Sequence, residues 1–160
     1  MMIPRYLFML LILPFVGLLA ACLPEVGMES SPQTIEVTQP YAFATVPGAR
    51  TAAAFMTIEN TGADADQLVA AESPVAGITE IHENRIDPED GTMMMRKIEA
   101  LDLAPGRPVA LEPQGHHIMF IDLQESLGMG QQFDLTLMFA SGKTVKTKVD
   151  VVAPGKIPHQ

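Results

Sequence analysis

The chain has 160 residues and a formal net charge of −9, from 19 acidic and 10 basic residues. A surface of this sign repels the phosphate backbone, so the composition argues against nucleic acid as a partner. The sequence holds one cysteine, Cys22, which excludes an internal disulfide and any site built from several thiolates. The length suits a single domain with one core.

The N-terminus has the features of an export signal. Residues 1–21 carry one charge, Arg5, followed by apolar runs that are too short for a spanning helix. They end in Leu19-Ala20-Ala21-Cys22, which resembles the lipobox of bacterial lipoprotein signal peptides. The resemblance implies cleavage before Cys22, lipidation of Cys22, and a protein anchored at a bacterial membrane, facing the periplasm or cell exterior. A plain signal peptide with an incidental cysteine is the alternative.

Three segments follow the signal. Residues 22–33 contain two prolines and predict a tether between the lipid and the domain. Residues 34–152 form the predicted domain, and residues 153–160, with Pro154, Gly155 and Pro158, predict a flexible tail.

Alternating apolar and polar residues run through the predicted domain. Val145, Thr147, Val149 and Val151, for example, share one face of a strand. The predicted strands are 34–38, 51–59, 67–71, 78–85, 93–99, 108–112, 116–123, 133–139 and 144–151. No segment keeps a helical period for three turns. The pattern predicts an all-β fold, an antiparallel Greek-key β-sandwich forming a single domain.

Histidine and methionine side chains recur on these strands. A strand period of two places His117 and Met119 on one face, about 7 Å apart along the backbone. His82 lies near the end of an earlier predicted strand, and Met93-Met94-Met95 opens the next one. Imidazole and thioether ligands together favour the soft ion Cu(I) over Zn(II), Ca(II) or Mg(II). A blue-copper electron carrier is disfavoured, because it requires a cysteine thiolate in the domain.

The spacing of these residues resembles a known family. Twenty-one residues separate Met95 from His117-Ile118-Met119, and Phe55-Met56-Thr57-Ile58-Glu59-Asn60 precedes a glycine turn. Residues 41–151 thereby resemble the periplasmic copper chaperone family PCu(A)C. The resemblance implies a cupredoxin-like sandwich that binds Cu(I) through His82, Met95, His117 and Met119.

Two positions depart from the family pattern. Twelve residues separate His82 from Met95, where the family usually has ten, so Met93 is a rival or auxiliary ligand. Asn84 stands where members often carry a further methionine. His116 is expected on the opposite face of its strand, and His159 in the tail is expected to take no part.

The resemblance implies a metallochaperone that delivers Cu(I) to the copper centre of a membrane-bound cytochrome oxidase, directly or through a thiol-bearing assembly factor. A lipoprotein that buffers copper with the same four ligands is the alternative. An enzyme is not expected, because Ser73, Ser126 and Ser141 lack a recognisable base and orienting partner.

Overall fold

The computed structural model describes residues 34–156, which contain ten strands and no helix. The predicted signal, the tether, Cys22 and His159 lie outside these residues. Within them, no helix is long and apolar enough to cross a bilayer. The strands, in chain order, are β1 (Ile35–Phe43), β2 (Thr51–Asn60), β3 (Asp66–Glu72), β4 (Ala76–Ile86), β5 (Met93–Lys97), β6 (Leu101–Leu103), β7 (Val109–Leu111), β8 (His116–Leu123), β9 (Gln132–Phe139) and β10 (Thr144–Val152).

The strands hydrogen-bond in the order β5-β4-β8-β7-β2-β1-β10-β9-β3-β6, with β8 also pairing directly with β2. The all-β prediction is confirmed, but the sheet is not antiparallel throughout. β1 and β10 run parallel, with Tyr41 opposite Asp150, and β7 meets β8 in parallel at Leu111 and His116. β1 and β10 are the first and last strands, so no hairpin between them requires an antiparallel pairing.

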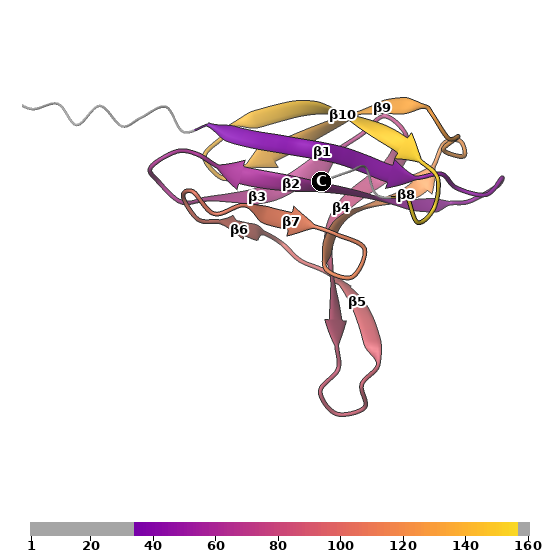
Figure 1. Cartoon of the computed structure of the whole chain (residues 1–160), viewed down its shortest axis with the longest axis horizontal. Helices are drawn as coiled ribbons and strands as arrows, with labels where there is room; N and C mark the ends of the chain where they lie inside the picture. The colour runs from indigo at the N-terminus through magenta and orange to yellow at the C-terminus, as the bar shows by residue number, and fades with distance from the viewer. Residues whose placement is uncertain (1–33, 157–160) are drawn as a thin grey trace, which may run out of the picture.

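The sheet folds over on itself and encloses the core between two layers (Figure 1). Ile58 of β2 and Phe120 of β8 face Leu135 of β9 and Val149 of β10 across this core, and all four are fully buried. The rings of Phe120 and Phe133 meet edge to face at 5.3 Å between centroids. One face of β2, β4 and β8 is therefore committed to the core, and their other face is the outer surface of the sandwich.

Several elements differ from the sequence prediction. β1 runs to Phe43, five residues beyond the predicted end at residue 38. β6 was not predicted, because three residues are too few to establish a strand period. β4 continues four residues beyond His82 to Ile86, so His82 lies inside the strand rather than near its end. The far part of β4 and its partner β5 form a hairpin that projects from the sandwich body (Figure 1). We call residues 83–96 of this hairpin the arm.

Candidate metal centre

The alternation of β8 places His117 and Met119 on the outer face. Ile118 and Phe120 point into the core and have no exposed surface. His117 and Met119, between and beside them, must point the other way. The same alternation therefore anchors the strand by its apolar residues and presents an imidazole and a thioether together.

The register of the neighbouring strands brings His82 and Met95 to this face. His82 of β4 lies directly opposite His117, and Asn84, two residues along β4, lies opposite Met95 of β5. The His82 and His117 rings have centroids 5.8 Å apart. The side chains that the sequence spacing singles out thus share one face of β8, β4 and β5.

Exposure increases across this group from the sandwich body to the arm. His117 is 3% exposed and the His82 side chain 13%, whereas Met95 is 53% exposed. A cavity of about 270 Å³ beside them is lined by Thr51, Ala52, Ala53, Phe55, Asn84, Met95, Pro113, His117 and Met119. His82 does not line this cavity and reaches the group through its contact with His117. The imidazoles form the closed side of the group, and Met95 forms the open side.

His117 is held by one ring nitrogen. Its Nδ1 lies 3.2 Å from the carbonyl oxygen of Gly115, which accepts the Nδ1 proton in the neutral imidazole. Burial lowers the pKa of His117 below its ordinary value, because the hydrogen bond to Gly115 offsets only part of the cost of burying a charge. The lowered pKa favours the neutral ring, in which Nε2 carries the lone pair because Nδ1 donates to Gly115.

His82 is held by the opposite ring nitrogen. Its Nε2 lies 2.9 Å from a carboxylate oxygen of Glu80, and Lys97 Nζ lies 3.2 Å from the other oxygen. The hydrogen bonds from His82 and then Lys97 hold the pKa of the Glu80 carboxyl below its usual range. His82 Nδ1 is buried and, alone among the buried side-chain nitrogen and oxygen atoms of the described residues, has no hydrogen-bond partner.

Burying a nitrogen without a hydrogen bond costs free energy, so the unpartnered Nδ1 of His82 needs a physical explanation. Metal-binding histidines commonly donate one ring N–H to a carboxylate or a backbone carbonyl and leave the other nitrogen for the metal. Glu80 and Gly115 supply these two acceptors here. Within residues 34–156 no three His, Cys, Asp or Glu side chains are placed to hold an ion.

Asn84 fixes the arm to the loop before β8. Its side-chain amide donates to the carbonyl of Pro113 at 2.8 Å, and its backbone N–H donates to Gly115 at 3.1 Å. The Gly115 carbonyl thus orients His117 and also holds β4. At the position where the resembled family often has a thioether, this chain has a residue that fixes the position of the cavity wall.

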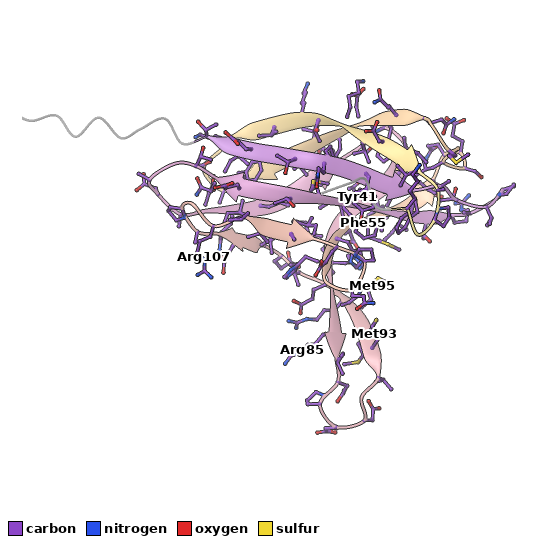
Figure 2. All side chains as sticks on the ribbon, viewed as in Figure 1. Tyr41, Phe55, Arg85, Met93, Met95 and Arg107 are labelled. Atoms are coloured by element: carbon purple, nitrogen blue, oxygen red, sulfur yellow. The ribbon has the colours of Figure 1, made fainter. Side chains whose placement is uncertain are left out.

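Aromatic rings close the body side of the group. The Phe55 ring lies 6.3 Å from that of His117, and Tyr41 packs 5.2 Å from Phe55, all between centroids. Figure 2 shows Tyr41 and Phe55 on the body, Met95 where the arm leaves it, and Met93 farther along the arm. These rings therefore lie on the body side of the cavity, and the half-exposed Met95 lies on its arm side.

The remaining residues from the sequence prediction lie as follows. Met93 is opposite Ile86 on the same face as Met95 but does not line the cavity, and His116 is on the other face, 3.6 Å from Glu83.

Sequence reasoning assigned no role to Glu80. It stands two residues before His82, so the strand period alone would have placed both side chains on one face.

Comparisons with known proteins agree with this fold. A family model described as "Putative lipoprotein LpqE-like" matches residues 35–151. The chain belongs to this LpqE-like family. A curated relative, "Putative lipoprotein Lxx21020" of Leifsonia xyli subsp. xyli (strain CTCB07), is 30% identical over 132 residues, which span 82% of this chain and 79% of the relative.

Solved structures of PCuAC domains share the fold of this LpqE-like chain. The copper-bound PCuAC domain from PmoF2 matches with a TM-score of 0.64 and 22% identity, covering 79% of this chain and 100% of that one. The Cu(I) form of DR1885 from Deinococcus radiodurans matches with a TM-score of 0.60 and 24% identity, covering 82% of this chain and 85% of that one. The predicted PCu(A)C-like, cupredoxin-like fold is confirmed.

Proposed function

We propose that this LpqE-like protein carries one Cu(I) ion as cargo on His82 Nδ1, His117 Nε2 and the sulfurs of Met119 and Met95. The observation that carries the proposal is the buried, unpartnered Nδ1 of His82, which stands beside a second imidazole held by its own Nδ1. Two neutral nitrogens and two neutral sulfurs suit a soft monovalent ion and need lose no proton to bind it. The copper-bound state of the PmoF2 domain and the Cu(I) state of DR1885 support the same choice of metal.

The lining of the cavity supports Met95, rather than Met93, as the fourth ligand. Met95 lines the cavity together with His117 and Met119, whereas Met93 lies one step farther out on the arm. The two extra residues between His82 and Met95 are accommodated by the length of the hairpin, because Met95 still pairs with Asn84. Met93 is thereby left outside the resting ligand set.

We propose that the cargo is handed on by ligand exchange. Met95 is half exposed, whereas His117 is buried, so an acceptor thiolate or imidazole can replace Met95 first while His117 still holds the ion. This order never releases free copper. The acceptor we propose is the copper centre of a membrane-bound cytochrome oxidase, or a thiol-bearing assembly factor that serves it.

The N-terminal motif and the relatives of this chain support a proposed location. The family and the Leifsonia relative are both described as putative lipoproteins, which supports an exported protein anchored by lipid on Cys22. The anchor would hold the copper site near a membrane surface. We propose that this surface faces the periplasm or the cell exterior, where a site without thiolates avoids the oxidation of thiolates to disulfide or sulfenate.

A competition titration with a chromophoric Cu(I) chelator tests the binding site. We expect one Cu(I) per chain, and at least about 100-fold weaker binding in His117→Ala, in line with the loss of a ligand. His116→Ala is the matched control, because His116 is the adjacent imidazole on the other face of β8. Equal losses in the two variants, or none in either, would remove the proposed site.

Delivery and buffering make different predictions in cells. If the protein delivers copper, a deletion strain grown at low copper loses oxidase activity, and His117→Ala fails to restore it while His116→Ala succeeds. If the protein only buffers copper, the deletion strain keeps its oxidase activity and becomes sensitive to added copper. The second result would refute delivery and leave the binding site intact.

A further inference from the structure

The arm carries more exposed apolar side chains than its packing requires. Met93 is 60% exposed and Met94 48%, and Ile86 opposite Met93 is also exposed. Methionines usually fill gaps in a core, yet these two fill none. Packing therefore does not explain why the outer part of the arm carries methionine side chains.

Strand register separates the two methionines by face. Met93 pairs with Ile86, two residues beyond the pair of Met95 and Asn84, so Met93 and Met95 point to the same side. Met94 pairs with Arg85 and points to the other side. Along the arm, the side that carries His82 therefore continues outward through Met95 to Met93.

The tip of the arm is closed by hydrogen bonds, which keep this register. Asp87 N–H donates to the carbonyl of Thr92 at 2.7 Å, and Gly91 N–H donates to that of Asp87 at 2.9 Å. The Asp90 carboxylate accepts from both the backbone N–H and the hydroxyl of Thr92. The arm is a hairpin of defined geometry, so Met93 holds a fixed place relative to Met95.

We propose that Met93 is an exchange ligand, an outer position through which Cu(I) enters and leaves the inner site. Same-face neighbours on a strand stand about 7 Å apart, a span that two thioether side chains can bridge around one ion. In the outward step a bond from Cu(I) to Met93 sulfur forms as the bond to His82 Nδ1 breaks, while His117 and Met95 stay bound until the acceptor replaces Met95. Copper stays Cu(I), both groups remain neutral, and no proton or electron is transferred. The inference rests on the proposed Cu(I) site.

The test compares Met93→Leu with Met94→Leu in the otherwise unchanged chain. Leucine keeps the volume and removes only the sulfur, and Met94 is the matched control on the opposite face. Equilibrium Cu(I) affinity is measured by chelator competition. The rate of transfer is measured by stopped flow, with bathocuproine disulfonate as the acceptor of Cu(I).

We expect Met93→Leu to keep its Cu(I) affinity within about twofold, a change below 0.5 kcal/mol on the affinity scale. Its transfer rate should fall by about fivefold or more, the effect of roughly 1 kcal/mol on the barrier. Met94→Leu should change neither quantity. Met95→Leu should lower the affinity itself, because Met95 belongs to the resting ligand set.

Two results would overturn the exchange role. An unchanged transfer rate in Met93→Leu means that Met93 takes no part, and a loss of affinity as large as that of Met95→Leu makes it a resting ligand instead. Failure of the binding site itself has a separate signature, because His117→Ala would then keep wild-type affinity. The two failures are therefore distinguishable in one set of titrations.

Discussion

His82 and His117 face each other across β4 and β8, with ring centroids 5.8 Å apart and ring planes inclined by 50°. Each ring is fixed through a different nitrogen, His82 by the Glu80 carboxylate and His117 by the Gly115 carbonyl. Of the two remaining nitrogens, Nδ1 of His82 is buried without a hydrogen bond in the described part of the chain, and Nε2 of His117 is the nitrogen that Gly115 does not engage. Two imidazoles that are each held by a hydrogen bond provide a pair of nitrogen ligands whose orientation is already fixed, at little further entropic cost.

Glu80 is expected to set the Cu(I) affinity although it does not touch the ion. Removing an outer hydrogen-bond partner of a metal-binding histidine typically costs about 10- to 100-fold in affinity, so Glu80→Ala should weaken Cu(I) binding within that range. Glu80→Gln keeps an oxygen that accepts from His82 and should lose less. Glu36→Ala, an exposed glutamate on β1, is the control. Chelator competition measures the Cu(I) affinity of each variant. A wild-type affinity in Glu80→Ala would show that the carboxylate has no such role.

Met119 is expected to determine which metal the site prefers. Replacing this thioether with imidazole in Met119→His makes the ligand set harder, and we expect weaker Cu(I) binding together with stronger Zn(II) and Cu(II) binding. Met138→His on β9, at another half-buried methionine, should leave the preference unchanged. Titrations with each metal measure the shift. If both variants bind all three metals as the wild type does, Met119 lies outside the coordination sphere.

Asp66 should make the fold sensitive to acid, independently of copper. Burial raises the pKa of this carboxyl, but hydrogen bonds from the Ser141 hydroxyl and from the backbone N–H groups of Gln67 and Ser141 outweigh burial, so the pKa lies below its ordinary value. A lowered folded-state pKa stabilises the protein above the unfolded value of about 3.9, and that stability is lost as pH falls through the folded pKa.

The corresponding measurement is urea unfolding of wild type and Asp66→Asn at pH 7 and at pH 3. We expect the variant to lose about 2 kcal/mol at pH 7, the size of a hydrogen bond to a charged group, and a smaller difference at pH 3. Asp134→Asn should cost under about 1 kcal/mol, because its ion pair with Lys148 is exposed. The same Asp66→Asn deficit at both pH values would contradict the assignment.

Alternation in the sequence was sufficient to predict most strands and the shared face of His117 and Met119. In β8 this worked because Ile118 and Phe120 are core residues, so the period of two leaves the polar and sulfur side chains only one direction. β6 could not be predicted, because three residues are too few to show a strand period. The parallel pairing of β1 with β10 joins strands from opposite ends of the chain, which no local pattern specifies.

The geometry of the site was harder to predict from the sequence than the strands were. Neither the register that sets His82 opposite His117 nor the one that sets Met95 opposite Asn84 is determined by spacing along the chain. The tautomers of the two histidines depend on Glu80 and on a backbone carbonyl at Gly115, and a carbonyl leaves no trace in the residue type. Only the structure could therefore reveal which ring nitrogen of each histidine is engaged in a hydrogen bond and which is not.

The most direct test of the central claim is X-ray absorption at the copper edge, recorded on the wild-type chain loaded with one equivalent of Cu(I). The account predicts a Cu(I) edge with both imidazole and sulfur scatterers around the ion, and a loss of imidazole scattering in His117→Ala but not in His116→Ala. A coordination shell without sulfur, or one that His117→Ala leaves unchanged, would contradict it.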